Sequence, residues 1–270
     1  MIPKVGIIIV NYNGGEDTLE CLNSLKNIDY PNYEVIVVDN ASDDASFILK
    51  EIHDNFPRVK ILALPRNHGF SGGNNVGISY ALENSAEYFL LLNNDTVVAP
   101  DFITQLVAAA ESDEKIGIVG AKIYYFNEKN HIWYNGGEFN WIGGGRHIQD
   151  GAIDIKPNDI EVKDTAYVTG CALLIKKQAV DKIGLLSEDF FMYYEDIDWS
   201  LRAQKSGFRT AVAPAAHIWH KVSRSASKLG APAIHYYHIR NALLLAEKHA
   251  SPLTLKMLIL WSRYYYIKQI

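Results

Sequence analysis

The sequence is poor in the features that mark several protein classes. Only two of its 270 residues are cysteines, Cys21 and Cys171, and neither has the spacing of a metal site, which argues against a disulfide framework. The formal net charge is −5, whereas nucleic-acid-binding domains are usually basic, so we expect no nucleic-acid partner. No apolar run approaches the roughly 18 residues of a membrane span, and we see no secretory leader. We therefore expect a cytoplasmic protein.

Short apolar runs alternate with helical patterns through the first half of the chain. Four runs predict strands buried on both faces of a mainly parallel sheet, at 5–10, 34–39, 59–64 and 88–93. Helical patterns follow them at 17–27, 45–56, 75–84 and 101–112. This alternation predicts an α/β fold with a doubly wound sheet and right-handed crossovers.

The second half of the chain is less regular. Residues 124–165 are rich in glycine and aromatic residues, and we expect a hairpin or mobile loop that covers a crevice. Further along, we expect a helix at 196–206, a strand at 208–213, and helices at 232–249 and 252–267. We predict a catalytic domain over 1–230, divided at residue 123, followed by a helical segment over 231–270.

Polar residues follow each predicted strand, where the ligand crevice of such a sheet lies. Asp95 follows the run at 88–93 and could give a hard oxygen ligand to Mg²⁺ or Mn²⁺ beside substrate phosphates. It could instead only cap the turn before Pro100. Asp39 ends another run and could accept a hydrogen bond from a base or a ribose, whereas Ser42 and Asp44 also suit a helix N-cap.

Residues 66–75 form a glycine-rich turn that begins with Arg66. Backbone N–H groups at a helix start can cradle an anion, and Arg66 would add a fixed positive charge. The turn matches neither the dinucleotide fingerprint nor a phosphate loop that ends in Lys-Ser/Thr. This absence argues against an ordinary dehydrogenase or ATPase.

The densest acidic cluster contains Glu195, Asp196 and Asp198, directly after an aromatic run. Apolar neighbours raise the pKa of a carboxyl group, which suits it to general-base work, and we expect this role for Asp196. The three acids could instead complement a helix dipole, and Asp198 could simply pair with Arg202.

Two histidines, His217 and His220, follow the strand expected at 208–213. Either histidine could complete the ligand shell of a metal ion, and we prefer His220. The spacing of the two histidines is not that of a zinc site. Alternatively, Lys221 and Arg224 could contact phosphate.

Together these residues resemble family 2 of the inverting glycosyltransferases, which have the GT-A fold, and in particular its rhamnosyltransferase-like members that build bacterial surface polysaccharides. The resemblance rests on short motifs in the family's order along nearly the whole chain: Ile9–Asn13, Val38–Asp44, Arg66–Phe70, Leu92–Thr96, Thr169-Gly170, Tyr194–Asp198, Arg202, His220 and Arg240-Asn241.

The resemblance implies a role for each matching position. Asp196 would take the proton of the acceptor hydroxyl with support from Glu195, and Asp95 with His220 would bind Mg²⁺ or Mn²⁺. Asn93 stands where the metal motif usually begins with Asp, which makes His220 more important. Acceptor contacts are implied at Gly170 and Asp198. The dTDP- or UDP-sugar site would comprise Asn11, Tyr12, Asn13, Asp39, Ser42, Arg66, Asn67, Gly69, Asn74 and Asn94.

The resemblance also sets the reaction class and its alternatives. The Gln-x-x-Arg-Trp motif of processive synthases is absent, so we expect transfer of one or a few sugars to a glycan or a lipid-linked acceptor. A sugar nucleotidyltransferase is an alternative, but the first strand lacks the Arg/Lys-rich phosphate loop that such an enzyme needs. A glycoside hydrolase would have no use for a metal site. The non-enzymatic alternative is a sugar-nucleotide or polysaccharide binding module.

Residues 221–270 hold eight Lys and Arg residues against the single acid Glu247, a net charge of about +7. Lys256, Trp261 and residues 263–268 resemble an interfacial helix, and we expect contact with the anionic inner leaflet of the plasma membrane. Alternatively, the aromatic side chains pack on the catalytic domain or on a second subunit of a homodimer.

Overall fold

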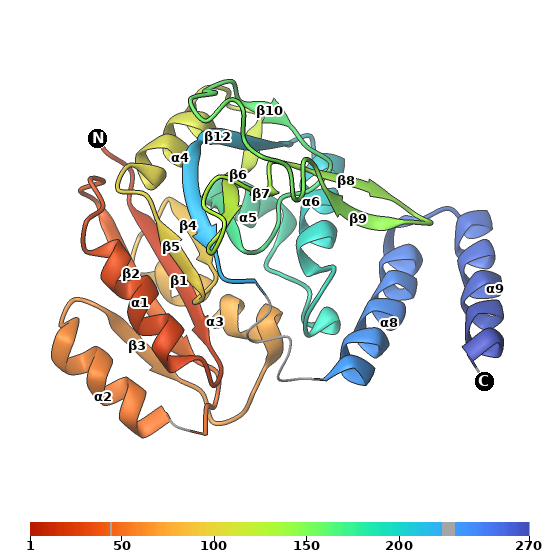
Figure 1. Ribbon diagram of the computed structural model, residues 1–270, viewed down its shortest axis with the longest axis horizontal. Helices are drawn as coiled ribbons and strands as arrows, with labels where there is room; N and C mark the ends of the chain where they lie inside the picture. Colours follow the sequence, from red (N-terminus) through yellow and green to blue (C-terminus); the bar gives the residue numbers. More distant parts are fainter. Residues whose placement is uncertain (44, 223–229, 270) are drawn as a thin grey trace.

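A mixed, mainly parallel sheet forms the centre of the protein (Figure 1). The computed structural model describes residues 1–43, 45–222 and 230–269, the side chains of 231 and 263–269 excepted. Asp44, Arg224, Lys228, Arg263 and Lys268, which the sequence analysis singled out, lie outside the described residues or side chains. The four predicted strands are β1 (Val5–Asn11), β2 (Tyr33–Asp39), β3 (Lys60–Ala63) and β4 (Tyr88–Leu92).

The remaining strands extend this sheet beyond β4. The order is β10-β12-β6-β11-β4-β1-β2-β3, in which β11 (Ala172–Lys176) runs antiparallel between β4 and β6 (Ile116–Tyr125). The strand β12 (Arg209–His220) pairs in parallel with β6 and carries β10 (Lys163–Asp164) on its other side. Two short strands, β5 (Thr96–Val98) and β7 (Ile132–Tyr134), pair with β12 and β6. The α/β prediction is confirmed.

Helices cover both faces of the sheet because alternate side chains of its strands point to opposite sides. Ile7 and Ile9 of β1 pack with α1 (Gly15–Leu25), α2 (Ala45–Asn55) and α4 (Phe102–Glu111). Ile8 packs on the other face with α3 (Gly69–Glu83), α5 (Lys177–Ile183) and α6 (Glu195–Lys205). The doubly wound arrangement is therefore confirmed.

Three predictions about individual elements were wrong. The third strand is half-exposed because β3 is an edge strand of the sheet. The helix expected from residue 75 begins at Gly69, six residues earlier, because its glycines let α3 approach β1: a Cβ on Gly77 would lie 2.4 Å from the side chain of Ile8. The strand expected to stop at 213 continues through Pro214 to His220, since a bulge between Ala213 and His217 absorbs the irregularity.

The region expected to cover the crevice contains a hairpin of β8 (Gly137–Asn140) and β9 (Gly144–His147). At the other end of the chain, α8 (Ala231–His249) and α9 (Pro252–Gln269) stand side by side near this hairpin (Figure 1). In the part of the chain that the structure describes, no helix is long and apolar enough to cross a membrane.

Candidate active site

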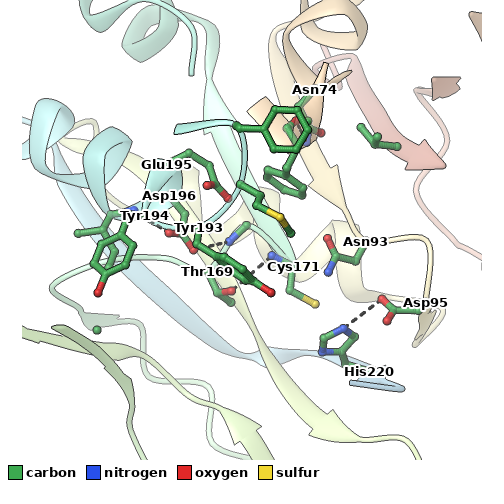
Figure 2. Close-up of a pocket in the computed structure, with 18 of the residues that line it drawn as sticks. Asn74, Asn93, Asp95, Thr169, Cys171, Tyr193, Tyr194, Glu195, Asp196 and His220 are labelled. Carbon is green, nitrogen blue, oxygen red and sulfur yellow. Dashed lines mark hydrogen bonds and ion pairs between the residues drawn. The ribbon is translucent and has the colours of Figure 1, made fainter. Parts of the chain in front are cut away.

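A cavity of about 630 Å³ opens at the carboxyl ends of β1 and β4. This volume is in the range of small-molecule sites, and the position is the crevice predicted for a doubly wound sheet. Two groups of polar residues face each other across it: Figure 2 shows Asp95 and His220 on one side and Glu195 and Asp196 on the other.

Asp95 and His220 form the first group. Asp95 follows β4, His220 ends β12, and the antiparallel pairing of β5 with β12 brings these two strand ends together. His220 Nε2 lies 3.0 Å from Asp95 Oδ1, and both side chains are buried. His220 Nδ1 has no hydrogen-bond partner among the described residues. The ring of Trp133 packs edge-on against the His220 ring, with centroids 4.5 Å apart, and limits its movement.

This pair fits a divalent cation. Two neighbouring ligands of an octahedral Mg²⁺ ion, each at about 2.1 Å, lie roughly 3.0 Å apart, which is the separation of the two side chains. Carboxylate and imidazole ligands suit Mn²⁺, and substrate phosphates and water complete such shells. Within residues 1–43, 45–222 and 230–269, no group of three or more His, Cys, Asp or Glu side chains could hold a metal ion. A metal ion here would therefore take its remaining ligands from water or from the phosphates of a substrate.

Glu195 and Asp196 form the second group, at the start of α6. Asp196 accepts hydrogen bonds from the N–H of Gly170 to Oδ2 at 3.1 Å and from the N–H of Ile197 to Oδ1 at 2.8 Å. Burial raises the pKa of Asp196 even though these N–H groups favour its charged form. Burial, and then the charge of Asp196, raise the pKa of Glu195 well above its usual value. Glu195 Oε2 has no hydrogen-bond partner in the described part of the chain. Both carboxyl groups therefore hold a proton more readily than exposed carboxyl groups do.

The backbone before this pair is strained. Phe191, Tyr193 and Tyr194 all have positive φ angles, of 51°, 67° and 73°, which are rare for residues other than glycine. Such a conformation persists only when its surroundings impose it. We call residues 190–194 the catalytic loop.

Two elements hold the catalytic loop. At the start of α3, the N–H groups of Phe70 and Ser71 donate to the carbonyl of Phe191, at 2.6 and 3.3 Å. From α8, the fully buried Asn241 donates through Nδ2 to the carbonyls of Phe190, Met192 and Tyr193. Gly69 also has a positive φ, and a Cβ there would lie 2.3 Å from the Phe191 carbonyl, so only glycine fits.

The glycine-rich turn at 66–75 therefore has a different role from the one predicted. Its N–H groups at Phe70 and Ser71 hold the catalytic loop rather than a free anion. Arg66 is exposed, contacts His68, and does not line the cavity. Asn67, Gly69 and Asn74 do line it, together with Asn94 of the strand-end motif and Gly170 opposite.

The predicted nucleotide residues after β1 and β2 divide into two sets. Asn11, Asp39 and Ser42 form a buried network behind the cavity wall, in which Asn11 Nδ2 donates to Asp39 Oδ1 at 2.9 Å and to Ser42 Oγ at 3.1 Å. Asn13 is bonded to Ser42 and does not line the cavity either. Tyr12 does line it, with 43% of its surface exposed, and is therefore accessible to a ligand.

Two further predictions are corrected by the geometry. Asp198 does not line the cavity: it pairs with Arg202 at 2.8 Å and with His249 at 2.7 Å, and so ties α6 to the end of α8. The alternative that Asp198 only pairs with Arg202 is thus closer to the structure. Lys221, a candidate for phosphate, instead pairs with Asp17 at 2.6 Å and Glu20 at 2.5 Å.

Some residues of the site were missed by sequence reasoning. Asn241 was recognised only as part of a motif, because its target is a carbonyl group some 50 residues away. His147 of the cover hairpin lines the cavity beside Trp133, and burial lowers its pKa. The predicted cover over 124–165 thus supplies part of the cavity wall.

Comparison with known proteins identifies the family of this chain. The sequence model of the family described as "Glycosyl transferase family 2" matches residues 6–184. This chain belongs to that family. The family 2 chain is 26% identical over 95% of its length to "dTDP-rhamnosyl transferase RfbF" of Shigella flexneri, covering 84% of that protein. It is 22% identical over 93% of its length to "N-acetylglucosaminyl-diphospho-decaprenol L-rhamnosyltransferase" of Mycobacterium tuberculosis, covering 86% of it.

The solved structures agree in fold. The mannosyltransferase of Pyrobaculum calidifontis, solved in complex with GDP-Man and Mn²⁺, superposes with a TM-score of 0.65. The alignment covers 98% of the family 2 chain and 70% of the mannosyltransferase at 17% identity. The expected GT-A fold and rhamnosyltransferase-like resemblance are therefore confirmed.

Proposed function

We propose that this chain is a metal-dependent, non-processive, inverting glycosyltransferase. It transfers rhamnose or a similar hexose from a dTDP- or UDP-sugar to a hydroxyl of a glycan or a lipid-linked acceptor, in the synthesis of a bacterial surface polysaccharide. The names of the Shigella and Mycobacterium relatives support rhamnose, and that of the Mycobacterium relative supports a diphospholipid-linked acceptor.

One observation carries the proposal. Asp95 and His220, which could bind a cation, face the same cavity as Glu195 and Asp196, two carboxyl groups whose pKa values are raised. Donor and acceptor chemistry need separate groups, because the leaving diphosphate gains negative charge while the attacking hydroxyl loses a proton. Asp95 with His220 matches the first requirement, and Asp196 with Glu195 matches the second. A binding module would have no need for the second pair.

Asp95 and His220 would hold the divalent cation, which as a Lewis acid would neutralise charge on the leaving diphosphate. Asp196 accepts the proton of the acceptor hydroxyl as that oxygen bonds to the anomeric carbon and the bond to the diphosphate breaks. Attack from the face opposite the diphosphate inverts the configuration. The charge of Asp196, added to the burial of Glu195, raises the pKa of Glu195 and favours its neutral form beside the proposed base.

The donor would enter beside Tyr12, whose exposed ring can stack on a base. Asn67, Asn74 and Asn94 line the same cavity as Tyr12 and the metal pair. The network of Asn11, Asp39 and Ser42 would support this wall from behind.

The remaining partner predictions concern the chain's environment. We propose a catalytic domain over 1–230, with 231–270 appended, and peripheral contact of the appended segment with anionic lipid at the inner face of the plasma membrane. Sedimentation with anionic liposomes tests the contact: it is wrong if the protein stays in the supernatant and deletion of the segment leaves solubility unchanged. Analytical ultracentrifugation tests the homodimer.

Calorimetric titration of dTDP-, UDP- and GDP-sugars with Mn²⁺ or Mg²⁺ tests the function. We expect one nucleotide class to bind more tightly with metal and its sugar to be transferred to an acceptor, with inversion detected by NMR. Tight binding with no transfer to any glycan or lipid-linked acceptor would leave a binding module instead. Release of diphosphate with formation of a sugar nucleotide would indicate nucleotidyl transfer.

A further inference from the structure

A second hollow, of about 200 Å³, lies beside the catalytic cavity. One wall is the tip of the β8–β9 hairpin, and the other is formed by α8 and α9. We call it the side groove. Its lining is mostly aliphatic and aromatic: Phe139, Trp141, Ile142, Ile239, Ala242, Leu243, Leu245, Leu258 and Trp261, with Gly143, Gly144, Tyr194, His238 and Ser262.

The side groove adjoins the catalytic cavity. Gly143, Tyr194 and His238 line both hollows. The rings of Tyr194 and His238 lie 6.1 Å apart, edge to face, and form the boundary between them. Tyr194 directly precedes Glu195 and Asp196, so the groove begins at the residue next to these two acids.

The chemistry of the side groove selects the occupant. No Asp, Glu, Lys or Arg side chain is among the described residues that line it. Burial lowers the pKa of His238, which favours its neutral form. A sugar in this position would need hydrogen-bond donors and acceptors, which saccharide sites supply and this lining mostly lacks. A hydrocarbon chain needs neither.

The rim of the side groove is also apolar, which again favours a hydrocarbon chain. Ile142 is 72% exposed and Trp261 is 50% exposed. The apolar surface continues along α9 through Leu253, Met257 and Leu260, which are also exposed. Soluble monomers rarely expose contiguous apolar surface, and where they do it usually marks a binding site.

We propose that the side groove binds the hydrocarbon chain of an amphipathic acceptor and thereby places the polar head of that acceptor at Asp196. The inference rests on the proposed function, and it narrows the acceptor class from any glycan or lipid-linked glycan to an acceptor with an alkyl or prenyl chain. A protein partner and a flat lipid surface are the competing occupants. The wall that the groove shares with the catalytic cavity, formed by Gly143, Tyr194 and His238, favours the acceptor's own chain over both.

The test uses two probes with the same head and different chains, octyl β-D-glucoside and methyl β-D-glucoside. Octyl glucoside is kept below its micelle concentration, and the full chain is titrated with each probe by calorimetry. We expect octyl glucoside to bind at least tenfold more tightly, since a few buried methylenes in an apolar pocket are worth about that factor.

Three variants locate the effect. Ile142→Ser removes an apolar rim residue, and Ala242→Phe fills the groove while keeping it apolar. Both should abolish most of the octyl preference. Phe47→Ser is the matched control, because Phe47 is 64% exposed on α2, outside the lining of the groove, and its loss should leave the preference unchanged. Metal-dependent binding of the donor nucleotide should be the same in all four proteins.

Each outcome bears on a separate claim. Equal binding of the two glucosides, or equal loss in Phe47→Ser, overturns the groove proposal. If Ala242→Phe keeps the octyl preference but lowers the sedimentation coefficient from dimer to monomer, the groove is an interface between copies. If it keeps the preference but no longer sediments with liposomes, the groove contacts a membrane surface. Failure of every nucleotide to bind would instead refute the proposed function, whatever the glucosides do.

Discussion

Replacing Asn241 with alanine would release the catalytic loop from α8. One fully buried amide group donates to three carbonyls of this loop, at 3.0 Å to Phe190, 2.7 Å to Met192 and 2.9 Å to Tyr193. Three residues of the loop have positive φ angles, at a cost of about 1–3 kcal/mol each, so the loop relaxes when its restraints are removed. Asp196 lies two residues after the last of them.

The magnitude follows from these contacts. Asn241→Ala removes the amide donor of the Met192 and Tyr193 carbonyls, whereas the Phe190 carbonyl still accepts from the Met192 N–H. Carbonyls that lose their donor in this way cost roughly 1–3 kcal/mol, which sets the expected loss in the free energy of unfolding. A displacement of about 1 Å at a catalytic group costs on the order of 100-fold in rate. We therefore expect kcat to fall about 100-fold in Asn241→Ala, while the affinity for the donor nucleotide stays within about threefold of the original, because Asn241 does not line the cavity.

Asn75→Ala is the matched control for this experiment. Asn75 is also a buried asparagine with three hydrogen bonds: Nδ2 donates to the Leu186 carbonyl and to Glu188, and Oδ1 accepts from the Leu186 N–H. These bonds hold the chain before the loop and not the loop itself. Chemical denaturation should show a similar loss of stability in both variants, with kcat reduced much more in Asn241→Ala. Equal kcat in the two variants would refute the positioning role.

Three further predictions concern the two groups that face the cavity. Asp196→Asn should leave donor affinity nearly intact and lower the transfer rate roughly 10²- to 10⁴-fold, the usual contribution of a general base; near-normal turnover would contradict the assignment. Asp95→Ala and His220→Ala should weaken nucleotide-diphosphate binding in calorimetry with Mg²⁺ or Mn²⁺ but not with chelator; equal loss in chelator would mean a structural role. Transfer requires the charged base, so kcat/KM should rise with pH through the apparent pKa of the Glu195–Asp196 pair, which burial places above the usual 3.8 of aspartate. An acid limb centred at or below that value would show that neither carboxyl is the base.

Much of the fold followed from local patterns in the sequence. Continuous apolar runs identified β1, β2 and β4, because a parallel strand buried on both faces has no polar face to interrupt the run. Helix positions followed from the spacing of residues such as Leu22 and Ile48, which are buried on one face of the sheet. The placement of Asp95 at the mouth of the crevice followed from its position after a strand. These features depend on neighbours in sequence, and a single sequence contains them.

The errors have a common physical cause. The glycines of α3 have low helix propensity, yet close packing of α3 on β1 requires them, so the prediction started the helix too late. Proline usually ends a strand, but a bulge between Ala213 and His217 lets β12 continue past Pro214. The alternative that placed Lys221 near phosphate fails because two acids of α1 pair with its charge. In each case a contact with a distant segment overrode a local preference.

The sequence by itself determined which residue types stand at the strand ends: an acid after β4, a histidine at the end of β12, and a pair of acids at the start of α6. Only the tertiary structure decided their partners. Pairing of β5 with β12 brings Asp95 to 3.0 Å from His220, and Asn241 of α8 fixes the strained backbone that presents Asp196. Hydrogen bonds and ion pairs between residues 48 to 125 positions apart depend on how the chain packs, and no local pattern encodes that distance. The acidic residues are a motif in the sequence, and packing makes them one site.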